Sequence, residues 1–235
     1  MLRRLLLCAL VLVVIPISAA GQAKQPPVIC LDPGHPSEIG PGARGKSMTE
    51  MRAAWLVALA LKARLEQDGY RVVLTKSKET EKVTNKRRAE IANAAKADLF
   101  LRLHLDAAPK GGFATYYPAK AGKVAGITGP SASVIAASKK IAPGFHRTAM
   151  KVLAGSLRDR GLHTDARTAI GARNGGALTG SIYSRVPVLL VEMCVITNLG
   201  DEAFISSERG RAKMVEALRA GIRASVPLPA PRQQR

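Results

Sequence analysis

A short apolar run, Val28-Ile29-Cys30-Leu31, stops abruptly in Asp-Pro-Gly and is followed at once by His35. Large and β-branched apolar residues between prolines are typical of a strand buried inside a parallel sheet. The Pro-Gly turn lets the backbone leave this strand sharply, with His35 at its carboxyl end. Open α/β sheets bind their ligands at that edge. The run therefore limits the chain to folds with a buried sheet and predicts a site where the strand ends.

Strand and helix patterns alternate along the rest of the chain. Strands are predicted at residues 28–31, 71–75, 98–105, 113–117 and 187–192, and helices at residues 47–68, 85–96, 131–141, 145–160 and 207–225. Ser47 and Asn85 are expected to cap the first two helices, and Gly69 to end the first. Alternation at these lengths indicates βαβ crossovers and hence an α/β fold with a mostly parallel sheet.

The first residues have the pattern of a secretory signal peptide: a basic start, an apolar core and small residues at a cleavage site. The expected division is a signal peptide at 1–20, a linker at 21–27, one catalytic domain at 28–226 and a Pro-rich tail at 227–235. No later apolar run has spanning length, so no stable membrane insertion is expected after cleavage. Cys30 and Cys194 would remain, and they could pair in an oxidising compartment or stay as small buried hydrophobes.

The formal net charge of +19 indicates that the binding partner of this protein is anionic. In a cytosolic protein such a charge would suggest nucleic acid, whereas in an exported protein it points to an anionic surface outside the cell. Only 4% of the residues are aromatic, and aromatic and basic residues do not interleave as they do on strand-binding surfaces. Nucleic acid is therefore not expected as a partner.

Four polar side chains are expected at one edge of the sheet. His35, His104 and Glu192 end predicted strands, and Glu50 begins a predicted helix. Two histidines and one carboxylate, with a fourth position open to water, are a common zinc set in hydrolases. His35, Glu50 and His104 satisfy that count, which leaves Glu192 as a carboxylate close to the metal.

Each of these residues also has a purely structural interpretation. Glu50 could close a capping box with Ser47. His35 could bond Asp32 in a turn, and His104 could belong to the core. Glu192 is harder to explain this way, because an unpaired carboxylate at the end of a buried strand is costly. The coincidence of four such residues favours a site.

The remaining histidines are weaker candidates. His146 is expected at the surface, near a helix start, and His163 in a loop that leaves a helix. Neither follows a predicted strand. Of the two, only His163 is considered for substrate contact.

The ordered motifs resemble the zinc-dependent N-acetylmuramoyl-L-alanine amidases of the Amidase_3 type, which hydrolyse bacterial peptidoglycan. The matching motifs are Leu31–His35, Glu50, Arg88 with Ala92 and Asn93, Asp98–Phe100 with His104, and Pro187–Glu192 with Asn198. The resemblance implies a three-layer fold, with a twisted sheet of about six strands and helices on both faces.

The resemblance also implies how the site works. One zinc ion per chain would be held by His35, Glu50 and His104, and Glu192 would be the catalytic glutamate. The reaction would be hydrolysis of the amide bond between N-acetylmuramic acid and the L-alanine of the stem peptide. Glu192 would take a proton from water and pass it to the departing amine.

The chain departs from this family beside His104 and after Glu192, where Met193-Cys194-Val195 replaces the usual Gly-Phe. Asp106 stands where the family usually has Asn, and its charge could bond a ligand histidine. Residues 107–191 contain no glutamate, so a glutamate that plugs the site, as in some relatives, is not available. That basic segment instead carries Lys110, Lys120, Lys123, Lys139, Lys140, Arg147, Lys151, Arg158, Arg160, Arg167, Arg173 and Arg185. These residues either bind stem-peptide carboxylates or other anionic wall polymers, or form a solvated face.

Two alternatives to the amidase remain open. One is a zinc peptidase or deacylase on the same scaffold, and the other is a non-catalytic wall-binding protein that uses the basic segment alone. In each case the protein is expected to be an exported monomer, periplasmic rather than extracellular.

Overall fold

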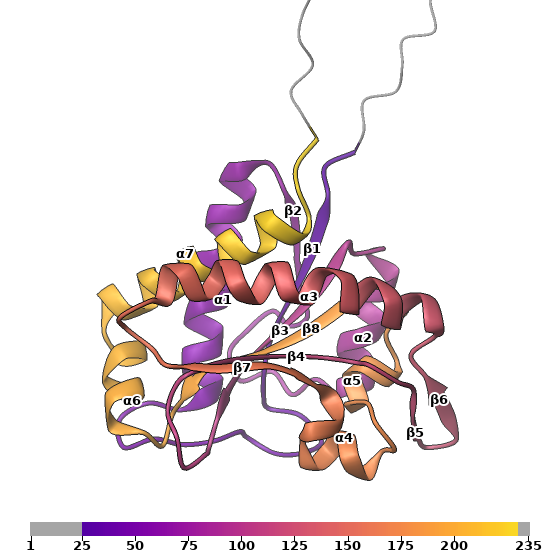
Figure 1. Ribbon diagram of the computed structural model, residues 1–235, viewed down its shortest axis with the longest axis horizontal. Coiled ribbons are helices and arrows are strands. Elements are labelled where there is room, and N and C mark those ends of the chain that lie inside the picture. Colours follow the sequence, from indigo (N-terminus) through magenta and orange to yellow (C-terminus); the bar gives the residue numbers. More distant parts are fainter. Residues whose placement is uncertain (1–24, 230–235) are drawn as a thin grey trace, which may run out of the picture.

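The structure is a computed structural model that describes residues 25–229 (Figure 1). The signal peptide expected at 1–20, most of the linker and the end of the Pro-rich tail lie outside these residues. Within residues 25–229, no helix combines the length and apolar character needed to cross a membrane.

Eight strands and seven α-helices make up the described fold. The strands are β1 (Val28–Pro33), β2 (Arg71–Leu74), β3 (Leu99–Asp106), β4 (Phe113–Tyr117), β5 (Gly122–Val124), β6 (Ile127–Gly129), β7 (Asp159–Thr164) and β8 (Val188–Val195). The helices are α1 (Glu50–Asp68), α2 (Asn85–Ala94), α3 (Ala132–Leu153), α4 (Ala169–Arg173), α5 (Thr179–Ile182), α6 (Leu199–Ser206) and α7 (Glu208–Ser225), with a 3₁₀ turn, η1 (Asp165–Arg167).

The main sheet has six strands in the order β2-β1-β3-β8-β4-β7, and β5 and β6 form a separate hairpin. β2, β1, β3 and β8 are parallel, β4 is antiparallel to β8, and β7 is parallel to β4. The carboxyl ends of β1, β3 and β8 therefore meet at one edge. The predicted mostly parallel sheet of about six strands is confirmed.

Helices cover both faces of this sheet, as predicted (Figure 1). On one face α1, α3 and α7 bury a large apolar cluster that includes Leu61, Phe145 and Met214. On the other face α2 packs Ala89 and Ala92 against a smaller cluster of strand residues. Strands buried on both sides need the near-continuous apolar sequence from which they were predicted.

Two predicted helix caps are wrong by one or two residues. Thr49, not Ser47, caps α1, and Thr84, not Asn85, caps α2. In both cases the side chain of the predicted cap has another partner: the Ser47 hydroxyl donates to Glu202, and the Asn85 amide donates to Glu38. Gly69 ends α1 with a φ of 101°, as expected of a glycine stop.

The two helices predicted around Pro143 form one helix, α3. Proline removes a helical hydrogen bond and usually breaks a helix. Here Ala142, Phe145 and Ala149 lie on one fully buried face, so continuous packing against the core offsets the missing bond.

The structure also corrects the segment after α3. The sequence predicts a helix up to residue 160 and a loop at residues 161–165, but α3 ends at Leu153 and Asp159–Thr164 is the edge strand β7. Its side chains are only partly covered and Gly161 has a φ of 100°, so it lacks the apolar run that marks a strand. Cys30 and Cys194 are buried and free, on strands that β3 separates.

Candidate metal centre

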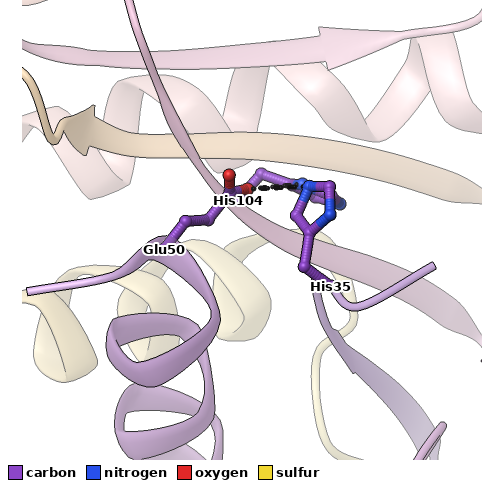
Figure 2. A group of neighbouring side chains, drawn as sticks. All are labelled: His35, Glu50 and His104. Atoms are coloured by element: carbon purple, nitrogen blue, oxygen red, sulfur yellow. Dashed lines mark hydrogen bonds and ion pairs between the residues drawn. The ribbon is translucent and has the colours of Figure 1, made fainter. Parts of the chain in front are cut away.

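Three elements bring the predicted metal-binding residues together. His35 follows β1, His104 lies near the end of β3, and Glu50 opens α1. Figure 2 shows the Glu50 carboxylate pointing toward the two imidazole rings. One donor atom from each residue lies within 4.8 Å of the others. On the neighbouring strand β8, Glu192 is the register partner of His104.

Glu50 is held in this position by hydrogen bonds. Its Oε1 lies 2.8 Å from His104 Nδ1 and 3.4 Å from His35 Nε2. The backbone N–H groups of Ala43 and Leu105 donate to its two oxygens at 2.7 and 3.2 Å. The capping-box interpretation of Glu50 is therefore wrong, because its carboxylate points to the histidines and not to Ser47.

The turn after β1 gives His35 an unusual backbone. Its φ is 52°, in the left-handed region that residues with a side chain rarely adopt. His35 Nδ1 lies 2.9 Å from the carbonyl oxygen of Gly40, not against Asp32 as the structural alternative required. Such a conformation costs energy and tends to occur at functional sites.

A buried ionic network behind the turn supports it. Asp32 is fully buried and accepts from Arg88 at 2.5 Å, from Arg102 at 2.9 Å and from the Thr75 hydroxyl at 2.5 Å. Arg88 also donates to the carbonyls of Pro33 and Pro36, on either side of His35. The network thus fixes the chain that carries the first histidine.

Sequence reasoning missed Arg102 as part of this support, although a signal was present. Alternate residues of a strand face the same side, so Arg102 and His104 share a face of β3. Arg102 also bonds Asn85, which ties β3 to the start of α2.

Burial and neighbouring charges set the ionisation of the two glutamates. Burial alone would raise the pKa of Glu50, but hydrogen bonds from His104 and His35 outweigh it and hold that pKa well below its usual range. Burial, together with the Glu50 and Asp106 charges, raises the pKa of Glu192 well above its usual value. Glu50 is thus kept as a carboxylate, whereas the raised pKa makes Glu192 the stronger base of the two.

The donor set fits a zinc ion. Two imidazoles and one carboxylate are standard zinc ligands. His104 Nε2 is buried and has no hydrogen-bond partner among the described residues. A buried imidazole nitrogen without a partner is costly, and a bound cation would satisfy it.

Three further sequence predictions are corrected near the site. Asp106 does not bond His104; it accepts from Arg160 Nη2 at 2.7 Å. His146 is buried rather than at the surface, with Thr115 and Asp159 each 3.0 Å from a ring nitrogen. His163 lies in β7, not in a loop, and its Nε2 contacts the carbonyl of Arg160.

A mostly parallel sheet with two histidines and a glutamate gathered at its carboxyl edge, beside a second glutamate, defines an α/β protein with a candidate metal site of the kind that hydrolases use. The sequence matches the family described as N-acetylmuramoyl-L-alanine amidase over residues 29–224. The chain belongs to this family.

Two proteins of Bacillus subtilis strain 168 are similar in sequence. The N-acetylmuramoyl-L-alanine amidase LytC is 30% identical over 210 residues, which cover 86% of this chain and 36% of LytC. The uncharacterised protein YqiI is 26% identical over 222 residues, which cover 94% of this chain and 95% of YqiI. The chain therefore spans little more than a third of LytC, but nearly all of YqiI.

Solved structures of lower identity share the fold. The catalytic domain of the amidase CwlV from Bacillus (Paenibacillus) polymyxa var. colistinus superimposes with a TM-score of 0.65 at 24% identity, covering 84% of this chain and 96% of that one. The apo form of the amidase Ami1 from Mycobacterium abscessus gives 0.68 at 21% identity, covering 86% and 99%. At these identities the likeness establishes the fold alone, and it agrees with the predicted three-layer architecture.

Proposed function

We propose that this protein is a zinc-dependent peptidoglycan amidase. It hydrolyses the amide bond between N-acetylmuramic acid and the L-alanine of the stem peptide. Membership of the family supports the reaction. The observation that carries the proposal is the convergence of His35, Glu50 and His104 next to Glu192.

In this proposal His35, Glu50 and His104 hold one zinc ion per chain, which supplies Lewis-acid polarisation of a carbonyl and activation of water. The chain's part is to keep the ligands ready to bind. The Ala43 and Leu105 N–H groups orient the Glu50 carboxylate. The Gly40 carbonyl orients the His35 ring.

Glu192 is the proposed proton carrier. Its Oε2 is buried and lacks a hydrogen-bond partner among residues 25–229. This oxygen takes a proton from the attacking water and delivers it to the nitrogen of L-alanine as the C–N bond breaks. The water oxygen stays on the lactyl carbon, so the products are a muramyl carboxylate and a peptide with a free amine.

Digestion of purified sacculi tests the proposal. The zinc-loaded protein is expected to release stem peptides with new L-alanine amines, which amine labelling and mass spectrometry identify. Glu192→Gln should lower the rate by about 10²–10⁴, the usual contribution of a general acid–base. A chelator should stop the release.

The products distinguish the alternatives. New ends at any other bond would indicate a zinc peptidase or deacylase. Clearing of sacculi that is unchanged in Glu192→Gln would contradict the assigned role of Glu192. Binding of sacculi without release of peptides would favour the non-catalytic wall-binding protein.

We further propose that the basic segment attaches the enzyme to anionic wall polymers. Its positive charge supports this, because cations attract anionic polymers. Salt screens such attraction between exposed charges, which falls off within about 10 Å at 0.1 M salt. Binding to purified sacculi should weaken from low to high ionic strength. Binding that does not depend on salt would contradict the proposal.

The family of cell-wall amidases indicates an exported protein. We propose that it works in the periplasm as a monomer, after cleavage of the signal peptide expected at residues 1–20. Release by osmotic shock and a monomeric mass in light scattering are the expected results. Recovery from the culture medium, or a dimeric mass, would contradict them.

A further inference from the structure

Glu192 lies at the junction of two cavities of different character. One, of about 200 Å³, is lined by His35 and His104, by apolar walls that include Ile170, Leu178 and Leu190, and by Arg88 and Arg102, whose charges are paired with buried Asp32. The other is a groove of about 680 Å³ lined by residues of β4, β7, η1 and the loop after β3. Glu192 lines both cavities, so a substrate that reacts beside it has room on either side.

The second cavity is basic. Its cations are Lys110, Arg158, Arg160 and Arg167, and we call it the basic groove. Of its acidic residues other than Glu192, Asp106 forms an ion pair with Arg160 at 2.7 Å. Asp159 lies 3.0 Å from His146, whose pKa burial lowers, so Asp159 keeps its charge and the four cations exceed the two aspartates.

Three of the four cations of the groove are not engaged in ion pairs. Lys110, Arg158 and Arg167 are exposed and form no ion pair with any described residue. They come from different parts of the chain: the loop after β3, the approach to β7, and η1. The fold thus brings these positive charges together in one groove, although the residues that carry them lie far apart in the sequence.

Arg160 adds a donor close to Glu192. Its Nη2 is taken by Asp106, but its Nη1 is buried and has no hydrogen-bond partner among the described residues. An unsatisfied buried guanidinium N–H is costly, and a carboxylate in the groove would supply the missing acceptor. Arginine is well suited to this, because its planar group matches a carboxylate.

We propose that the basic groove binds the carboxylates of the stem peptide and that the apolar-walled cavity takes the muramyl side. This inference rests on the proposed function and assigns the direction in which the substrate crosses Glu192. The chemistry of the substrate supports it. The carboxyl group of muramic acid is consumed in the scissile amide, so the sugar side carries no charge there, whereas the stem peptide carries free carboxylates.

Titration of a soluble peptide tests the groove without requiring hydrolysis. The probe is a synthetic stem tripeptide that begins with L-alanine and carries free carboxylates, and the comparison is the same peptide with amidated carboxylates. The zinc-loaded Arg158→Gln/Arg167→Gln variant should bind the acidic peptide at least about tenfold more weakly than the wild type, as measured by calorimetry. It should bind the amidated peptide as the wild type does.

Lys139→Gln/Lys140→Gln is the matched control. It removes the same charge from the basic segment, but from the exposed face of α3, away from the groove. Its dissociation constant for the acidic peptide should equal that of the wild type, and equal melting temperatures should show that both variants are folded.

Equal weakening by the two double variants, or equal weakening of the two peptides in the groove variant, would overturn the inference. Failure of the wild type to cleave sacculi would contradict the proposed function instead, and the peptide titration would still decide whether the groove binds carboxylates.

Discussion

The backbone at Gly34 passes so close to His104 that a side chain has no room. A β-carbon there would lie 2.6 Å from His104 Cε1 and 2.9 Å from the Leu103 carbonyl oxygen. A β-carbon at Gly42 would likewise lie 2.8 Å from Glu50 Oε2 and 2.8 Å from His35 Cδ2. Since Gly42 also has a φ of 89°, two glycines set how closely the three proposed ligands can approach one another.

Gly34→Ala is expected to push the His104 ring out of position. Zinc affinity should fall by about 10- to 100-fold, the range found when the groups that orient a metal ligand are disturbed. Competition with a chromophoric chelator measures this affinity. Gly144→Ala is the control, because a β-carbon there meets nothing within 4 Å. Unchanged zinc affinity in Gly34→Ala would contradict the steric argument.

At the scale of the elements, a single buried carboxylate connects β1, α2 and β3. Asp32 on β1 is bonded by Arg88 of α2 and Arg102 of β3. Burial alone would raise the pKa of Asp32, but the two guanidinium charges outweigh it and hold the pKa well below its usual range. Two cations and one anion form this network, so loss of the anion leaves two buried guanidinium groups with like charge.

Asp32→Asn is expected to destabilise the fold by about 3–5 kcal/mol at pH 7, the usual cost of breaking a buried pair. Urea denaturation measures it. The exposed pair of Lys86 and Glu90, 3.9 Å apart, offers a control, and Glu90→Gln should change stability by less than about 1 kcal/mol. An Asp32→Asn protein as stable as the wild type would show that the network contributes nothing to the fold.

The same network predicts a dependence on pH. Because the folded-state pKa of Asp32 lies below the unfolded value of about 3.9, its stabilisation is complete above about pH 5 and is lost on acidification. The difference in stability between wild type and Asp32→Asn should therefore narrow as the pH falls below about 4. Denaturation at a series of pH values checks this, and a constant difference would contradict it.

For the whole molecule, a metal bound at the proposed site between β1, β3 and α1 would link binding to folding. A ligand that binds only the folded state stabilises it by about 2.7 kcal/mol at a hundred times its dissociation constant. A domain of this size gains about 2–4 °C of melting temperature for each kcal/mol.

Zinc at that concentration should therefore raise Tm by about 5–10 °C over protein with chelator. Differential scanning calorimetry measures the shift. Glu192→Gln should keep it, because Glu192 is not a proposed ligand, whereas His104→Ala should lose it. Equal Tm values with zinc and with chelator in the wild type would contradict the proposed metal site.

Several parts of the fold could be predicted because their signals are local. The apolar runs of β1, β3 and β8 and the glycine stop of α1 depend on neighbouring residues alone. β7 could not be predicted, because an edge strand that pairs only with β4 needs no continuous apolar face. The continuity of α3 through Pro143 depends on packing against distant elements, which no local pattern contains.

The sequence by itself determined the kind of sheet and the four candidate site residues. The apolar runs of the strands and the residues that end them are local features, which neighbouring residues alone define. Only the tertiary structure decided what these residues touch. It turned Glu50 from a possible cap into a partner of two histidines and paired Asp106 with Arg160. It also brought the four cations of the basic groove together beside Glu192, because contacts between segments far apart in the chain depend on how the elements pack.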